Sequence, residues 1–239
     1  MIPYFPQLVW HVGRFEIHAF GIAAALALNV GFFLVMWRAR RTNLDRDLAA
    51  GLFLATAVAG TLAGHLLFVI QNRGSLLRVW QGQSSAGVAL GVGIVATAIY
   101  FLLPDHWLYL DALAFAFPFV WMLVRAGCAM AHDHPGRSTN SLLGVRFPAG
   151  TRYDLGLLEF LLAAVLCLIF LALARAGWRQ FLALAMIATG FIRLALIPLR
   201  LPDANATPVD MITFSAACLA GLAVLWLRQG TLGSSTKAR

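Results

Sequence analysis

The densest group of chemically active side chains in this sequence lies between residues 132 and 137. The run reads His132, Asp133, His134, Pro135, Gly136 and Arg137. Two imidazoles that flank a carboxylate can supply general acid and base catalysis near neutral pH. A glycine followed by an arginine can offer backbone amides and a guanidinium to a phosphate group. The run therefore predicts catalysis on a phosphate ester, with a surface turn that carries exposed histidines as the alternative.

The same two histidines could form half of a metal site. A third ligand would have to come from Asp133 or from the distant His18 or His65, and the sequence has no HExxH spacing. The three cysteines lie far apart, each in apolar sequence: Cys128, Cys167 and Cys218. They indicate neither a disulfide framework nor a CxxC metal site. We therefore expect no metal ion and no cofactor.

Two arginines lie within apolar stretches, where a charge is costly. An arginine at the centre of a membrane costs at least about 2.5–3.5 kcal/mol on insertion scales. Arg125 follows AFAFPFVWMLV and Arg193 lies in MIATGFIRLALIPL. The candidate counter-charges are Glu159 in LGLLEFLLAA, and Asp111 and Asp154 at the starts of spans. We expect Arg125, Arg193 and Glu159 to converge near the outer leaflet, in a site that opens sideways to lipid. The alternative is that the arginines snorkel to an interface, or pair with Glu159 only to hold helices together.

Membrane-spanning helices must position these residues. The chain has 239 residues, of which 61% are hydrophobic and 12% charged, and its mean hydropathy is +0.80. Soluble domains are about 45–50% apolar and about 25% charged, so this composition excludes a soluble enzyme, a disordered chain and a disulfide-bonded secreted module. We expect an all-α integral membrane protein, a bundle of seven transmembrane helices in a single domain, residues 1–239. The expected spans are about 18–37, 48–70, 86–103, 111–131, 155–174, 180–198 and 211–227.

The longest segment between spans is residues 132–154, which is too polar for lipid and too rich in glycine and proline for a helix. We expect it to form a small, mostly irregular cap on the outer side of the membrane. The basic cluster of Arg38, Arg40 and Arg41 follows the first span. By the positive-inside rule this cluster predicts an outer N-terminus and an inner C-terminus. The 18 Lys and Arg residues outnumber the 10 Asp and Glu residues, but no basic run with interleaved aromatics indicates nucleic acid as a partner.

Several segments, spread over most of the chain, carry a family resemblance. IHAFGI, residues 17–22, is similar to I-R-W-Y-G-L, and TLAGHLLFVI is similar to a glycine-rich G-G-R-L-x-Y segment. VRAGCAMAHDHPGR, residues 124–137, resembles the signature G-R-I-G-N-F-I-N-G-E-x-W-G-R, and LLGVRFP follows it as P-W-G-V-x-F-P does. RYDLGLLEF resembles H-P-x-Q-L-Y-E-x, and TGFIRLALIPLRLPD resembles Y-G-x-x-R-F-x-V-E-x-x-R-x-P-D. In this order and spacing, the chain resembles the prolipoprotein diacylglyceryl transferases, multi-pass enzymes of the bacterial inner membrane with seven spans.

The resemblance implies a reaction in which the diacylglyceryl group of phosphatidylglycerol moves to the thiol of a prolipoprotein cysteine, with release of glycerol phosphate. It also implies which residues bind the phospholipid or act in catalysis: Arg125, Asp133, Gly136 and Arg137 from the signature, and Glu159, Arg193 and Arg200 from the later motifs. Arginines suit this chemistry because they can stabilise the charge that develops on a leaving phosphate. We therefore expect a phospholipid substrate and a prolipoprotein acceptor.

The chain departs from the family's pattern where the motifs have tyrosine, histidine, asparagine, tyrosine and an acidic residue. These positions are Phe20, Ala86, Cys128, Thr189 and Ile197. Groups that would position or deprotonate the thiol are thereby replaced. Alternative functions are a transferase with another acceptor, or a non-catalytic relative that binds phospholipid headgroups; a channel or small-solute transporter is a weaker alternative.

With the family histidine replaced at Ala86, one histidine of the 132–137 run is the expected general base. We prefer His132 because it directly follows the fourth span. His134 precedes Pro135, and a residue before proline is biased toward extended backbone that would point it outward. His65, in the second span, is an expected substrate contact and the next candidate for the base, although a single histidine on such a helix is more often a packing residue.

Overall fold

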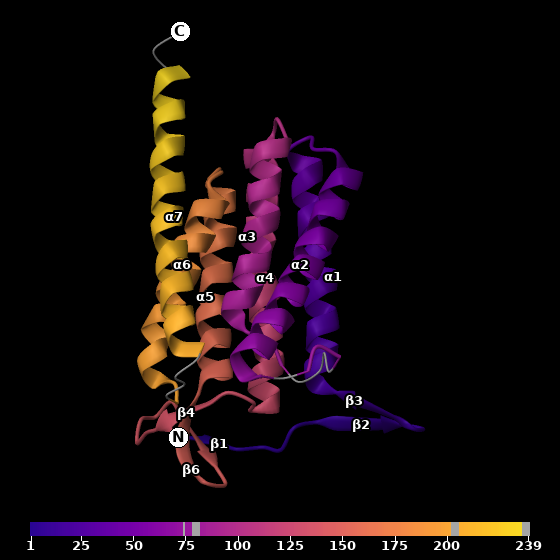
Figure 1. The fold of residues 1–239 in the computed structure, drawn as a ribbon, viewed down its shortest axis with the longest axis vertical. Helices are drawn as coiled ribbons and strands as arrows, with labels where there is room; N and C mark the ends of the chain where they lie inside the picture. Colours follow the sequence, from indigo (N-terminus) through magenta and orange to yellow (C-terminus); the bar gives the residue numbers. More distant parts are fainter. Residues whose placement is uncertain (74, 78–81, 202–205, 236–239) are drawn as a thin grey trace. The chain divides into compact units, whose positions relative to one another are not determined.

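Seven helices long and apolar enough to cross a membrane run along the described part of the chain (Figure 1). The computed structural model describes residues 1–239 except 74, 78–81, 202–205 and 236–239. The helices are α1 (Ala19–Arg41), α2 (Arg46–Asn72), α3 (Ser85–Leu102), α4 (His106–Ala131), α5 (Leu155–Arg175), α6 (Phe181–Leu196) and α7 (Ala206–Ser235). The expected all-α, seven-span class is confirmed, and the protein is a multi-pass membrane protein.

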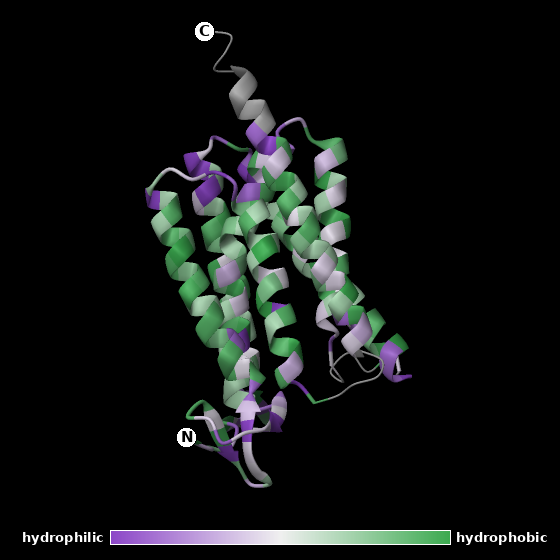
Figure 2. Ribbon diagram, turned by 90° about the vertical axis from the view of Figure 1, so that its left-hand side faces the viewer, coloured by the Kyte–Doolittle hydropathy of each residue, from purple (hydrophilic) through white to green (hydrophobic). Residues whose placement is uncertain are grey.

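The helix ends follow local sequence signals. The α1 helix extends beyond its expected end to include Arg38, Arg40 and Arg41 in its last turn, where cations complement the helix dipole. Asp45 caps α2 by accepting hydrogen bonds from the first-turn backbone amides. The α6 helix ends early, and η1 (Ile197–Leu199) continues it as a 3-10 turn because Pro198 has no N–H to donate. Figure 2 shows hydrophobic residues along the helices and hydrophilic residues concentrated at helix ends and in the strands.

The chain divides into two compact units. The first unit comprises Met1–Phe33, Ala116–Gly177 and Ala195–Pro202, and the second comprises Leu34–Phe115, Trp178–Leu194 and Asp203–Arg239. Three of the borders between the units fall inside α1, α4 and α6, and the other two fall between helices. The single domain expected from the sequence stays a prediction.

All strands of the described chain belong to the first unit. They are β1 (Ile2–Pro3), β2 (Val9–Val12), β3 (Phe15–His18), β4 (Pro135–Ser138), β5 (Gly144–Phe147) and β6 (Gly150–Asp154). One sheet has the order β1-β5-β6-β4, with β1 parallel to β5 and the other pairs antiparallel. β2 and β3 form a separate hairpin directly before α1. Figure 1 shows β1, β4 and β6 gathered where α5 begins.

The expectation that residues 132–154 are mostly irregular was wrong. They form three strands, and β1, from the other end of the sequence, completes their sheet. Pairing satisfies backbone N–H and C=O groups that a loop would leave to water. Pro148 and Ala149 make a two-residue turn between β5 and β6, and Gly150 follows it with φ +113°, a conformation that glycine tolerates.

In the second unit, small residues allow close helix contacts. A Cβ added at Gly87 of α3 would lie 2.5 Å from the backbone oxygen of Ala63 on α2. A Cβ at Gly221 of α7 would lie 3.0 Å from the backbone oxygen of Ala183 on α6. Glycine at such positions lets two membrane helices approach by their backbones, as small residues commonly do between membrane helices.

Candidate active site

A fully buried carboxylate at the start of α5 organises the charged residues of the first unit. Glu159 has no exposed surface. Its Oε2 atom lies 2.7 Å from Nε of Arg125 on α4, and its Oε1 atom lies 3.6 Å from Nη2 of Arg200, which follows η1. The indole N–H of Trp121 also donates to Oε2, at 3.3 Å. Two guanidiniums therefore meet at one buried carboxylate, an arrangement that brings two bidentate phosphate-binding groups together.

A close approach of α4 and α5 aligns this pair. A Cβ at Gly156 would lie 2.9 Å from the backbone of Cys128 and Ala129 on α4, so only glycine fits there without a shift. Glu159 follows Gly156 by three residues and Arg125 precedes Cys128 by three, one helical turn in each case. The two side chains thus project from neighbouring turns of two helices held in backbone contact.

The strand β4 contacts the residues just before Arg200. A Cβ at Gly136 would lie 2.5 Å from the backbone oxygen of Leu199. The exposed Arg137 donates from Nε to the backbone oxygen of Arg200, at 3.0 Å, and Arg152 donates to the backbone oxygen of Gly136, at 3.3 Å. Gly136 and Arg137 therefore position the backbone that carries Arg200.

His132, which follows α4, contacts Asp154, the residue directly before α5. Its Nδ1 lies 2.5 Å from Oδ2 of Asp154, whose Oδ1 accepts the backbone N–H of Leu157 and caps α5. Three aromatic rings lie around the imidazole, with centroids 4.8–5.6 Å away: Tyr4, Phe5 and Phe147. The Nε2 atom is buried without a hydrogen-bond partner among the described residues. His132 has φ +52°, and the matching signature residue is glycine, which favours this left-handed backbone.

Asp133 and His134 lie beside Cys128. The Nδ1 atom of His134 is 3.0 Å from Oδ1 of Asp133, and both side chains are 42% exposed. Donor atoms of Cys128, Asp133 and His134 all lie within 4.8 Å of one another. Arg125 donates from Nη1 to Sγ of Cys128, at 3.7 Å, which links these three residues to the arginine–glutamate pair.

Cys128 is a site residue that the sequence did not indicate, although its spacing of three residues from Arg125 places both on one helical face. Asp154 is a candidate counter-charge in the sequence, and in the structure it pairs with His132 and caps α5. Its position before the apolar run of α5 is a recognised signal for such a cap. Neither signal indicates the long-range partner that each residue contacts.

Two sequence-predicted residues belong to the second unit. Arg193 is buried, and its guanidinium carbon lies 5.0 Å from the ring centroid of Phe214 on α7. His65 on α2 contacts the following loop, with Nε2 at 3.1 Å from the backbone oxygen of Leu76 and Nδ1 at 3.4 Å from that of Gly82. The expected convergence of Arg193 with Arg125 and Glu159 stays a prediction.

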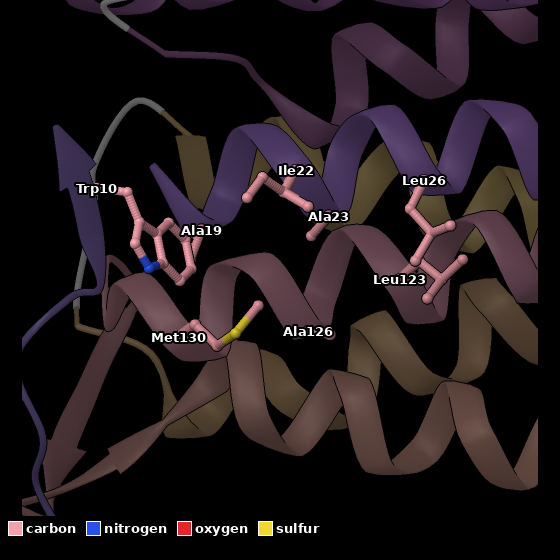
Figure 3. Close-up of a pocket in the computed structure, with 8 residues that line it drawn as sticks. All are labelled: Trp10, Ala19, Ile22, Ala23, Leu26, Leu123, Ala126 and Met130. Atoms are coloured by element: carbon pink, nitrogen blue, oxygen red, sulfur yellow. The ribbon is translucent and has the colours of Figure 1, made fainter. Parts of the chain in front are cut away.

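An apolar cavity of about 250 Å³ lies between α1 and α4 within the first unit (Figure 3). Figure 3 shows Trp10 of β2 at one end, near Met130, and Leu26 facing Leu123 at the other. The lining offers hydrocarbon contacts along both helices. Such a cavity suits an alkyl chain better than a polar ligand.

Comparison with known proteins decides the family. The family model described as prolipoprotein diacylglyceryl transferase matches residues 7–229. The chain belongs to this family. Individual members of the family are distant relatives, and three illustrate the range.

A phosphatidylglycerol–prolipoprotein diacylglyceryl transferase of Fusobacterium nucleatum is 28% identical over 96 residues, which cover 37% of this chain and 33% of that protein. The enzyme of the same name from Caldanaerobacter subterraneus is 26% identical over 163 residues, covering 62% of this chain and 61% of that one. A Clostridium perfringens enzyme is 27% identical over 154 residues, covering 59% and 57%. The chain thus spans between about a third and three fifths of these relatives' length.

Proposed function

We propose that this protein is a phospholipid-dependent transferase that moves the diacylglyceryl group of phosphatidylglycerol to a thiol, with a prolipoprotein cysteine as the acceptor. The observation that carries the proposal is that Arg125 and Arg200 both contact the buried Glu159, which brings two guanidiniums to one place. Family membership supports the same chemistry. The relatives described above are named for phosphatidylglycerol and prolipoprotein.

The proposed step is a substitution at the glyceryl carbon that bears the phosphate. The acceptor loses its proton, its sulfur forms a bond to that carbon, and the bond from carbon to the phosphate oxygen breaks. The electron pair leaves with the oxygen, and the product is glycerol phosphate. Arg125 and Arg200 would stabilise the charge on this oxygen, and Glu159 would hold both guanidiniums in place.

We assign activation of the acceptor to the pair of His134 and Asp133 in place of His132. His134 is partly exposed and lies in the group that contacts Arg125 through Cys128. His132 is buried among aromatic rings and its Nδ1 pairs with Asp154. A group that activates the acceptor must be able to reach it, and His134 meets that requirement.

The remaining residues have proposed roles in binding the lipid. The cavity beside Trp10 would hold part of an acyl chain, since its lining is apolar. Helix α4 forms one side of the cavity and also carries Arg125. Gly136 and Arg137 would support the headgroup site through the backbone of Arg200. Arg193 is a further proposed phosphate contact. A buried arginine in a span costs free energy, and such residues usually mark a functional site.

The proposed location is the bacterial inner membrane, with the N-terminus outside and the C-terminus in the cytoplasm. The basic end of α1 supports this orientation. The sheet of the first unit would then face the outer side, where a secreted prolipoprotein presents its cysteine.

A second candidate is a phospholipid-binding relative without transferase activity. The departures at Ala86, Thr189 and Ile197 favour it, because they remove side chains that the family's motifs contain. His65, fastened to backbone oxygens, would then be a purely structural residue.

One assay separates these candidates. The purified full chain in detergent is mixed with phosphatidylglycerol labelled in its glycerol headgroup and with a lipobox peptide. The transferase should release labelled glycerol phosphate and add a diacylglyceryl group to the peptide. A peptide with serine in place of cysteine tests a hydroxyl acceptor. Lipid that co-purifies with the protein but never turns over, with either peptide, would contradict the proposed activity and support the second candidate.

A further inference from the structure

Three side chains with metal-binding atoms meet at the end of α4, although the sequence alone indicated no metal there. Cys128 offers a sulfur, Asp133 a carboxylate oxygen and His134 an imidazole nitrogen, and these atoms lie within 4.8 Å of one another. Metal–ligand bonds of about 2.0–2.3 Å place tetrahedral ligands roughly 3.5 Å apart. The Asp133–His134 distance, 3.0 Å, is already in that range. The exposed parts of both side chains leave them room for the rest of the adjustment.

We propose that Cys128, Asp133 and His134 bind a divalent cation of the zinc class. A thiolate and an imidazole select zinc and similar transition metals, whereas magnesium and calcium prefer sites made of oxygen alone. Three protein ligands leave a fourth tetrahedral position open, which is the arrangement of a catalytic zinc site. Because the Asp133 and His134 side chains are 42% exposed, this position is open to a ligand from solvent.

One neighbour of Cys128, Arg125, favours a thiolate ligand. Arg125 donates an N–H to Sγ of Cys128, at 3.7 Å, and such a donor stabilises the negative charge of a bound thiolate. Glu159 lies 2.7 Å from Arg125, and its negative charge reduces the repulsion between that guanidinium and the metal cation. The carboxylate of Asp133 and the thiolate of Cys128 together offset the two charges of the metal ion.

Two of the three proposed ligands are not specified by the family signature. Cys128 replaces the signature's asparagine, and His134 occupies a position that the signature leaves unrestricted. Each of these residues adds a side chain that can bind a transition metal. The chain that lacks the family's thiol-activating side chains therefore carries a separate means of activating a thiol.

This role rests on the proposed transferase function. The open position would take the sulfur of the acceptor, because a thiol that coordinates such a cation loses its proton. The proton passes to water. The bound thiolate then forms the sulfur–carbon bond, and the phosphate leaves with the electron pair of the broken carbon–oxygen bond. Asp133 and His134 thus activate the acceptor as ligands of the cation.

The binding test uses the full chain in detergent, stripped with a chelator and then titrated with zinc chloride or cobalt chloride. We expect one ion per chain, and with cobalt a tetrahedral absorption spectrum with a thiolate-to-metal charge-transfer band. Cys128→Asn and His134→Gln should each remove that band. Cys167→Ser and His18→Gln, which alter residues outside the cluster, should keep it. A stripped protein that binds no ion, or a Cys128→Asn protein with the same band, would overturn the proposal.

A second measurement separates the metal site from the transferase. Removal of the ion should lower thiol transfer by about 10²-fold or more, and zinc should restore it. Full transfer by the stripped protein would overturn the part of the cation in the reaction and leave the transferase standing. A charge-transfer band that depends on Cys128, in a protein that transfers to no acceptor, would support the metal site and contradict the transferase. Since Cys128→Asn restores the signature residue, an unfolding variant is not expected, and gel filtration checks this.

Discussion

At the scale of single residues, Arg125 contacts two candidate functional groups, Glu159 and Cys128. We expect Arg125→Ala to lower turnover by about 10²–10³-fold, the loss of about 2.7–4 kcal/mol that follows removal of one donor to a developing oxyanion. Arg125→Lys should restore little, since an ammonium group cannot make the bidentate contact to phosphate. Release of glycerol phosphate measures both variants.

The control for Arg125 concerns folding. Removing one partner of a buried ion pair can cost about 3–5 kcal/mol because the other charge stays buried. Arg125→Lys keeps the positive charge, so its thermal unfolding should stay close to that of the parent. A lysine variant with normal stability and parental turnover would show that Arg125 is not a specific phosphate ligand.

Arg193 is predicted to be needed for turnover as well. Arg193→Ala should abolish glycerol phosphate release while the protein still folds, if its guanidinium contacts the phosphate. Its contact with the ring of Phe214 offers a purely structural role instead. Activity of Arg193→Ala within about twofold of the parent would assign Arg193 to that structural role.

The two histidines of the 132–137 run should respond differently to substitution. His134→Gln should lower transfer by about 10²–10⁴-fold, because a group that activates the acceptor is gone. His132→Gln should keep most of the transfer and instead lower the unfolding temperature, since His132 joins α4 to Asp154 of α5. If transfer falls only in His132→Gln, with its unfolding temperature unchanged, the assignment made from the sequence is the right one.

At the scale of elements, we expect the position of β4 against the end of η1 to determine where Arg200 lies. We expect Gly136→Ala to shift β4, because the new Cβ would lie 2.5 Å from the backbone oxygen of Leu199. The shift would move Arg200, and a displacement of about 1 Å in a catalytic group can cost about 10²-fold in rate. Turnover and thermal unfolding are the measurements.

Gly93 provides the matched control for Gly136. It lies on α3, and a Cβ there would meet nothing within 4 Å. Gly93→Ala should therefore leave activity unchanged and stabilise the helix by about 0.5–1 kcal/mol. Equal activities for Gly136→Ala and Gly93→Ala would mean that β4 does not hold Arg200 in position.

At the scale of the whole molecule, the orientation in the membrane can be tested by labelling. Ala149→Cys places a thiol in the turn between β5 and β6, and Thr42→Cys places one after the basic end of α1. In intact spheroplasts a membrane-impermeant maleimide should label the first variant and spare the second. The parent chain, with its three cysteines, gives the background. The reverse pattern would place the N-terminus in the cytoplasm.

The sequence by itself determined the number and approximate limits of the helices. Long apolar stretches bounded by charges must be helical in lipid, because only a helix pairs its own backbone there. It also located Arg125, Glu159 and the 132–137 run, since charges in or beside a span stand out in composition alone. These are local properties, which a pattern over about twenty residues can contain.

Only the tertiary structure decided which of these residues meet. Glu159 pairs with Arg125 and Arg200, His132 with Asp154, and Cys128 with Arg125 and the Asp133–His134 pair. A charge or a thiol does not encode its partner, which depends on the helix faces that glycine contacts bring together. For the same reason the sheet was unforeseen: β1 pairs with β5 from the far side of four helices in the sequence, and so short a strand has too little pattern to indicate its partner.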